Sequence, residues 1–120
     1  MWEVEYTNEF GFWWDDLSYS EQCSINTYVR MLEEHGPKLK FPYSSGIQGA
    51  QCGRMRELRI QHKGEPYRIL YVFNSKRSAL LLIGGRKIDN DRWYCKYVRQ
   101  ADRLYNEYLQ ETLEESLIDE

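Results

Sequence analysis

The side chains best suited to bind or cleave a phosphodiester lie between residues 57 and 94, and the first of them fall on two consecutive alternating segments. Glu57 and Arg59 share one face of RMRELRIQH, because side chains alternate across a strand. Arg68 lies in PYRILYVF, on the face opposite its aromatic residues. A cation among side chains that should be buried needs an anionic partner or an open concave face. Two interpretations remain open: Arg68 forms an ion pair with Glu57, or it binds a phosphate.

A second group of polar residues follows the apolar segment SALLLIGG. Arg86 and Lys87 come directly after two glycines, which we expect to form a tight turn that exposes the end of a strand. Tyr94 lies in the first turns of the next helical segment, beside Arg92 and Trp93. Arginines stabilise the charge of a phosphorane-like transition state, and aromatic rings stack on unpaired bases. The predicted open face gathers Arg59, Arg68, Arg86 or Lys87, and Tyr94.

The N-terminal third of the chain predicts one strand and a helical hairpin. Residues 1–6 alternate apolar and acidic side chains, as a strand with one buried face does. Apolar residues at helical spacing follow from Phe10, and Ser18 with Glu21 forms a capping box that opens a second helix. The Gly36-Pro37 pair ends that helix.

The remaining segments predict a meander and a last helix. Residues 36–53 are rich in Gly, Ser and Pro and are interpreted as an ordered loop. Three strand-like segments joined by KGE and NSKR predict antiparallel pairing. A helix follows from Asn90, and residues 111–120 either extend it or fray. The order β-α-α-β-β-β-α predicts one α+β domain over residues 1–120, an antiparallel sheet with two N-terminal helices and a C-terminal helix on one side of it.

Charge is distributed unevenly along the chain, although its formal net charge is only −3. Residues 38–103 hold fifteen basic and five acidic side chains, whereas residues 1–37 hold one base and eight acids. Residues 104–120 hold six acids and no base. A basic middle of this kind suggests a polyanionic partner, with ordinary solvated charge as the alternative interpretation.

Composition narrows the class of protein further. The chain of 120 residues, 42% hydrophobic and 15% aromatic, suffices for one modest core. It has no run of eighteen apolar residues and its start is unlike a signal peptide, so we expect no membrane helix and no export. The three cysteines lack metal or redox spacing, which predicts reduced thiols in a cytoplasmic protein without metal or cofactor.

Several segments together resemble the RelE/ParE superfamily of bacterial and phage toxins. They are MRELRIQHKGEPYRILYVF, LLLIGGRKIDNDRWY and ADRLYNEYL, with further similarity in the loop PYSSGIQGA and in the two predicted N-terminal helices. Within the superfamily these segments are most similar to the HigB-like branch, also called the phage-derived Gp49-like family. The resemblance covers about residues 3–110.

The resemblance implies a microbial RNase-like, RelE-type fold and a toxin of a type II toxin–antitoxin system. Many such proteins are mRNA interferases, endoribonucleases that cut mRNA on the ribosome without a metal. The RNA 2′-hydroxyl attacks the adjacent phosphate and leaves a cyclic phosphate and a 5′-hydroxyl. The implied partners are a HigA-like helix-turn-helix antitoxin, the ribosome and mRNA, with operator DNA bound only through the antitoxin.

The resemblance also assigns roles to single residues. Arg68 matches the arginine that resembles the phosphate-stabilising residue, and Arg59 matches a basic residue on the neighbouring strand. Tyr94 matches an aromatic residue that stacks on a base or assists proton transfer. Glu57 is implied to be either a base or an orienting partner.

The loop GGRKID departs from the family pattern, because many relatives read roughly GGDKTG there. Lys87 is kept, whereas Arg86 replaces an acid. His62 falls on the strand face opposite Glu57, so no histidine base is expected at the site. The predicted catalytic residues are Arg68, Lys87, Tyr94 and Glu57, and the predicted RNA-binding residues are Arg59, Arg86, Arg92 and Trp93.

Two other functions remain open at this point. A ParE-like chain of the same fold inhibits gyrase and needs no acid or base. A phage-derived protein without activity acts by binding a partner, and Trp2, Trp13 and Trp14 with the acidic helices would then form its interface. Those tryptophans are equally typical of a core.

Overall fold

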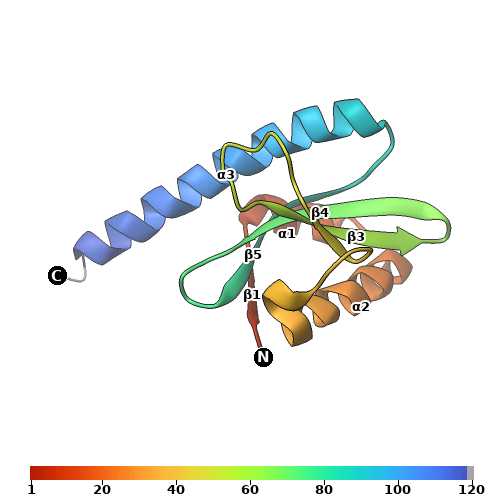
Figure 1. The fold of residues 1–120 in the computed structure, drawn as a ribbon, viewed down its shortest axis with the longest axis horizontal. Helices are drawn as coiled ribbons and strands as arrows, with labels where there is room; N and C mark the ends of the chain where they lie inside the picture. The colour runs from red at the N-terminus through yellow and green to blue at the C-terminus, as the bar shows by residue number, and fades with distance from the viewer. Residues whose placement is uncertain (119–120) are drawn as a thin grey trace.

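A five-stranded sheet forms the centre of the structure, a computed structural model that describes residues 1–118 (Figure 1). The strand order is β1-β5-β4-β3-β2, in which β1 runs parallel to β5 and the other neighbours pair antiparallel. The elements in chain order are β1 (Glu3–Tyr6), α1 (Asn8–Asp15), α2 (Tyr19–His35), a 3₁₀ turn (Gly36–Lys38), β2 (Ser44–Gly46), β3 (Arg56–His62), β4 (Glu65–Phe73), β5 (Ser78–Arg86) and α3 (Asn90–Ile118).

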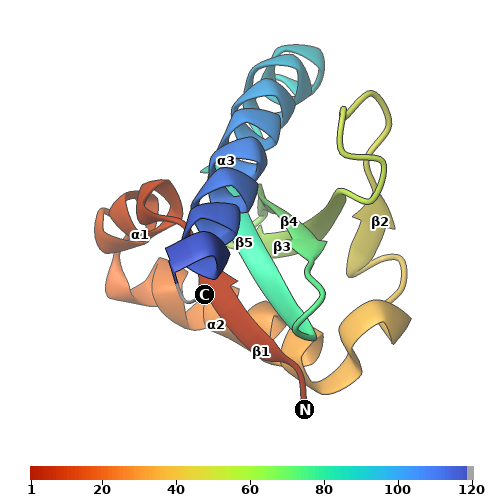
Figure 2. The ribbon, with the colours of Figure 1, turned by 90° about the vertical axis from the view of Figure 1, so that its left-hand side faces the viewer.

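Helices cover both faces of this sheet, as Figures 1 and 2 show. On one face, α1 and α2 pack against Leu58, Ile60, Ile69 and Tyr71. On the other, α3 packs against a second apolar cluster that includes Leu70, Val72, Leu80 and Leu82. The prediction that all helices lie on one side was therefore wrong. The central strands β4 and β5 are apolar on both faces, and each face must be removed from water.

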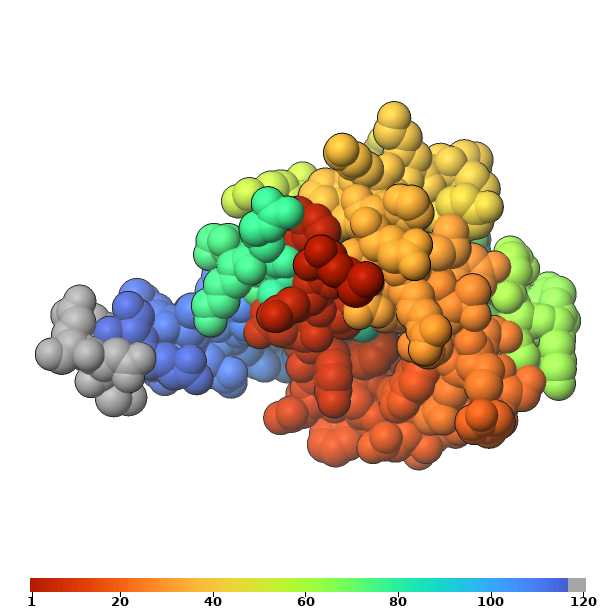
Figure 3. All heavy atoms as spheres, turned by 90° about the horizontal axis from the view of Figure 1, so that it is seen from below, coloured from red at the N-terminus to blue at the C-terminus, as the bar shows by residue number. Residues whose placement is uncertain are grey.

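The N-terminal elements fold as their sequence predicted. Thr7 accepts a hydrogen bond from the Phe10 amide and caps α1, and the capping box of Ser18 and Glu21 opens α2. Gly36 ends α2 at a φ of 54°, a backbone conformation that favours glycine. Seen from the side away from α3, α1 and α2 lie over the sheet, and the edge strand β1 lies beside them (Figure 3).

The segment between α2 and β3 contains more regular structure than the predicted loop. It begins with the 3₁₀ turn and includes β2, which pairs with β3 at the sheet edge. A strand of three residues is too short to show the alternation by which strands are detected in a sequence. Pairing places Ser45 directly opposite Glu57.

The two glycines of LLLIGG lie inside β5 and do not form the predicted turn. A Cβ atom on Gly84 would overlap the Trp13 ring, and one on Gly85 would lie 3.1 Å from Trp93 Nε1. The glycines therefore let one tryptophan approach each face of β5. Their function is close packing, and the chain turns only after Arg86.

The last helix is longer than the sheet that it covers. Its N-terminal half packs on β4 and β5, and its C-terminal half projects beyond the sheet (Figure 1). Residues 111–118 continue the helix, which favours extension over fraying; positions 119 and 120 of the predicted tail lie outside the described residues. No helix among residues 1–118 combines the length and the apolar character needed to cross a membrane.

Candidate functional site

A buried carboxylate lies at the centre of the polar face that the sequence predicted. Glu57 on β3 is only 5% exposed. Its Oε2 atom accepts a hydrogen bond from the Ser45 hydroxyl at 2.7 Å and lies 3.4 Å from an Arg59 nitrogen. Its Oε1 atom accepts the phenolic proton of Tyr94 and lies 3.3 Å from Arg68 Nε. We call Glu57, Arg59, Arg68, Lys87 and Tyr94 the Glu57 cluster.

Register brings the two arginines of the cluster together. Arg59 and Arg68 face each other on β3 and β4, and Arg68 faces Gly85 on β5. The space over Gly85 is occupied by the rings of Trp93 and Tyr97, which pack beside Arg68 on this face of the sheet. Two guanidinium groups therefore flank one carboxylate, and the cluster keeps a net positive charge that a phosphate can neutralise.

Arg68 is held by protein partners and also reaches an opening. It is 3% exposed, and one of its terminal nitrogens donates to the Tyr67 carbonyl at 3.0 Å. Its Nε proton has no aligned acceptor despite the nearby Glu57 carboxylate. The ion pair with Glu57, one of the two interpretations that the sequence left open, is present. Arg68 also borders, with Arg59 and Gln61, a cavity of about 160 Å³, so the ion pair does not seal it from a ligand.

Arg59 forms the outer edge of the cluster. Its guanidinium lies 5.1 Å from the centre of the Phe41 ring, a cation–π contact that orients it. Its backbone amide donates to the Tyr43 carbonyl at 2.8 Å. The segment before β2 thus supports a cation that is far away in the sequence.

Tyr94 is positioned by the first turns of α3. Burial raises the pKa of its phenol above the ordinary value of 10.0, and its hydrogen bond to Glu57 raises it further. The phenol therefore stays protonated throughout the neutral range. It is half-buried, whereas Glu57 beneath it is buried, so Tyr94 is the more accessible of the two.

Lys87 follows β5 and completes the cluster. Its backbone amide donates to the Pro66 carbonyl at 2.8 Å, and its Nζ atom lies 5.6 Å from the centre of the Tyr94 ring. Burial lowers the pKa of its ammonium group below the ordinary value of 10.5, and the positive charge of Arg68 lowers it further. A lysine whose proton is held less firmly is a better proton donor.

The predicted RNA-binding residues are not all brought to this face. Arg86 faces Tyr67 across β4 and β5, on the side of the sheet that α2 covers. There the Tyr67 hydroxyl donates to Glu21 Oε2 at 2.5 Å, and His62 Nδ1 lies 2.6 Å from the Ser24 hydroxyl. The sequence left open whether Arg86 or Lys87 lies beside Tyr94, and it is Lys87 that does so. The predicted placement of His62 on the face away from Glu57 is confirmed.

Arg92 and Trp93, at the start of α3, differ in their exposure to solvent. Arg92 is exposed and lies 3.7 Å from an Asp89 oxygen. Trp93 is 5% exposed, and its ring stacks on Tyr97 with 4.6 Å between ring centres. A ring buried between Gly85 and Tyr97 offers no free face to a base, so Trp93 is not placed to stack on RNA as the sequence predicted.

Sequence reasoning missed Ser45, which donates to Glu57, because it lies in the segment interpreted as a loop. It also missed Asp102, which is 8% exposed on α3 and accepts the backbone amides of Gln51 and Cys52. No spacing rule links either residue to its partner in the sequence. Among residues 1–118, no three His, Cys, Asp or Glu side chains gather into a metal-binding group.

Comparison with other proteins agrees with the resemblance seen in the sequence. A family model for phage-derived Gp49-like proteins matches residues 12–106. The chain is 30% identical over 99 residues to HigB2 and 33% identical over 98 residues to HigB3, two proteins of Mycobacterium tuberculosis described as candidate toxins. Each alignment covers 81% of this chain. The chain spans 49% of HigB2 and 84% of HigB3.

The fold has a solved counterpart at much lower sequence identity. The crystal structure of the isolated RelE toxin of E. coli matches 82% of this chain and 98% of its own chain, with a TM-score of 0.58 and 11% identity. This likeness supports the RelE-type α+β fold. The family model and the HigB3 alignment, each over most of the chain, show that the chain belongs to the phage-derived Gp49-like family.

Proposed function

We propose that the chain is the toxin of a type II toxin–antitoxin system and acts as a ribosome-dependent endoribonuclease that cleaves mRNA without a metal. The description of HigB2 and HigB3 as candidate toxins supports the first part. The observation that carries the second part is the Glu57 cluster, in which a buried carboxylate is bonded to a half-buried phenol and surrounded by three cations.

The cluster contains the groups that cleavage by a 2′-hydroxyl requires. We propose that the 2′-hydroxyl passes its proton to the Tyr94 oxygen while Tyr94 passes its own proton to Glu57, since Glu57 itself is buried. The 2′-oxygen bonds to phosphorus, and the bond from phosphorus to the 5′-oxygen breaks. Lys87 gives a proton to that 5′-oxygen, so the products are a 2′,3′-cyclic phosphate and a 5′-hydroxyl. Arg68 and Arg59 stabilise the charge on the phosphate in the transition state.

The partners and location of the protein follow from the same proposal. A toxin of this kind needs a cognate antitoxin, for which we propose a HigA-like helix-turn-helix protein. Operator DNA would be bound only through that antitoxin. The ribosome and mRNA place the activity in the cytoplasm.

Expression of the wild-type chain in bacteria tests the proposal directly. We expect growth arrest, with new mRNA 5′ ends inside translated regions and a 5′-hydroxyl at each end. Mapping of 5′ ends before and after induction measures this, and a Tyr94→Phe variant is the control that keeps the ring and removes the phenolic proton. Broken gyrase–DNA complexes with intact mRNA would instead favour a ParE-like inhibitor, and an unaffected culture would favour an inactive binding protein.

The Lys87 proton predicts a pH dependence. If Lys87 protonates the leaving oxygen, single-turnover cleavage on ribosomes falls as the pH rises through the Lys87 pKa. Because that pKa is lowered, the fall begins at a lower pH than an exposed lysine would give. Lys87→Arg should lower the rate at neutral pH by about 100-fold or more and remove the alkaline fall, because a guanidinium stays protonated.

Rates of mRNA cleavage measured over a series of pH values test this dependence. Lys76→Arg in the turn between β4 and β5 is the matched control, and it should keep the wild-type rate and profile. A Lys87→Arg variant with the wild-type pH profile would show that Lys87 is not the proton donor.

A further inference from the structure

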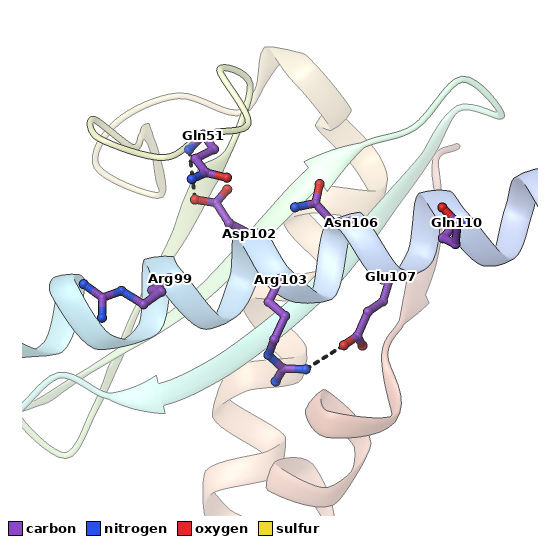
Figure 4. A pocket seen from close by; sticks show the side chains of 7 residues that line it. All are labelled: Gln51, Arg99, Asp102, Arg103, Asn106, Glu107 and Gln110. Atoms are coloured by element: carbon purple, nitrogen blue, oxygen red, sulfur yellow. Dashed lines mark hydrogen bonds and ion pairs between the residues drawn. The ribbon is translucent and has the colours of Figure 1, made fainter.

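A trough runs along α3 beside the segment that joins β2 to β3. It consists of two adjoining cavities of about 340 and 430 Å³, which share Gln51, Arg99 and Asp102. The first cavity is also lined by Tyr94, so the trough opens directly beside the Glu57 cluster. Figure 4 shows the second cavity, with Gln51 reaching down from its loop to Asp102 on the helix.

The trough is fixed in shape by a buried anchor. Both carboxylate oxygens of Asp102 accept backbone amides of the loop, from Gln51 at 2.9 Å and from Cys52 at 3.1 Å. Ile47, Ala50 and Cys52 pack against the apolar cluster under α3. A preformed trough binds a ligand without first having to order its own loop, which lowers the entropic cost of binding.

Cations follow one face of α3, of which Arg99 and Arg103 line the trough. Arg92, Lys96, Arg99 and Arg103 are spaced by four, three and four residues, so they share one face of the helix. All four are exposed. The helical rise of about 1.5 Å per residue sets successive cations about 5–6 Å apart along the axis. This spacing suits the repeated phosphates of an extended strand.

The line of cations on α3 ends at Arg103. Arg103 is bonded to Glu107 at 2.8 Å, and the described helix beyond it carries further acids and no base. Lys96 and Arg99 form no ion pair with any described residue, although Lys96 Nζ lies 5.4 Å from the centre of the Tyr97 ring. No described acid therefore neutralises either charge. A polyanion can therefore extend from the Glu57 cluster along α3 only as far as Arg103.

We infer that the trough and its line of cations, together the α3 track, bind the single RNA strand that continues from the cleaved bond. Lys96 and Arg99 contact its phosphates, and the amide side chains of Gln48 and Gln51 contact base edges. Half of the residues that line the trough carry an amide or guanidinium group: Gln48, Gln51, Arg99, Arg103, Asn106 and Gln110. Its two acids are already bonded within the protein, Asp102 to the loop and Glu107 to Arg103. The inference rests on the proposed function, because it takes the Glu57 cluster as the place where the strand is cut.

Binding of 2′-O-methyl RNA, which lacks the attacking hydroxyl, tests the α3 track apart from cleavage. We expect the double variant Lys96→Ala/Arg99→Ala to bind a strand of about 12 nucleotides about tenfold more weakly than the wild type does, and one of about 4 nucleotides equally well. The slope of log affinity against log salt should fall by about 1.4 for the longer strand, about 0.7 for each lost phosphate contact. Fluorescence anisotropy measures both quantities.

The matched control removes two cations from the opposite layer, Arg30→Ala/Lys38→Ala, and should bind the longer strand as the wild type does. The track is overturned if the wild type does not bind the longer strand, if Lys96→Ala/Arg99→Ala binds it unchanged, or if the control loses as much affinity. It is also overturned if the track variant loses affinity for a poly-glutamate peptide but not for RNA. Wild-type protein that binds as expected but cleaves no mRNA on ribosomes would contradict the proposed function and leave the track in place.

Discussion

Replacing Arg68 by alanine is expected to lower the rate of mRNA cleavage on ribosomes by about 100- to 1,000-fold, the usual effect of removing one charged donor from a transition state. Arg68 lies between Glu57 and a small open cavity, and no other arginine of the Glu57 cluster is as deeply buried. A buried cation interacts with phosphate more strongly than an exposed one, because water screens it less. Single-turnover cleavage of a translated mRNA measures the change.

Two further variants separate the charge of Arg68 from its shape and from folding. Arg68→Lys keeps the charge but loses the planar fork, and we expect it to recover only part of the rate. Arg30→Ala on α2 removes an exposed arginine and should cleave as the wild type does. An Arg68→Ala protein that unfolds at the wild-type temperature and still cleaves at the wild-type rate would remove Arg68 from the site.

Replacing Glu57 by alanine is expected to abolish cleavage and to lower the free energy of unfolding by about 3–5 kcal/mol. The loss of stability follows because the carboxylate is the ion-pair partner of Arg68, which is 3% exposed and has no ion pair with any other described residue. Urea unfolding followed by circular dichroism measures it. The double variant Glu57→Leu/Arg68→Met should regain most of the stability, because apolar residues of similar volume can replace a buried ion pair.

Glu57→Gln distinguishes a proton acceptor from a positioning residue. The amide keeps the size of the side chain and can still accept a hydrogen bond from Tyr94, but it cannot take the proton that Tyr94 releases. We expect its cleavage rate to fall by about 100-fold or more, with a smaller loss of stability than for Glu57→Ala. A glutamine variant that cleaves at the wild-type rate would show that Glu57 only positions Tyr94 and Arg68.

Strand alternation predicted the centre of the site correctly. It placed Glu57, Arg59 and Arg68 on one face of neighbouring strands and His62 on the other, and the structure confirms both placements. This succeeds because the period of two is a local property of the backbone, which tertiary packing does not change within a regular strand.

Contacts between residues that are far apart in the chain could not be predicted from the sequence. Register sends the side chain of Arg86 to the α2 side and leaves Lys87 beside Tyr94, and no local pattern distinguishes these neighbours. The same limit applies to Ser45, whose strand is recognisable only through its pairing with Glu57. The glycines of β5 were misread for a related reason: a turn and a close approach both favour glycine, and only the positions of Trp13 and Trp93 decide between them.

The sequence by itself determined the order of the helices and the longer strands, the faces of β3 and β4 that carry charge, and the family to which the chain belongs. Tertiary structure alone decided that α3 lies on the face opposite α1 and α2, that Tyr94 reaches Glu57, and that Asp102 fixes the loop of the α3 track. Local periodicity states which side chains must be buried, but not which distant element buries them. That choice is made when both apolar faces of β4 and β5 are covered at once.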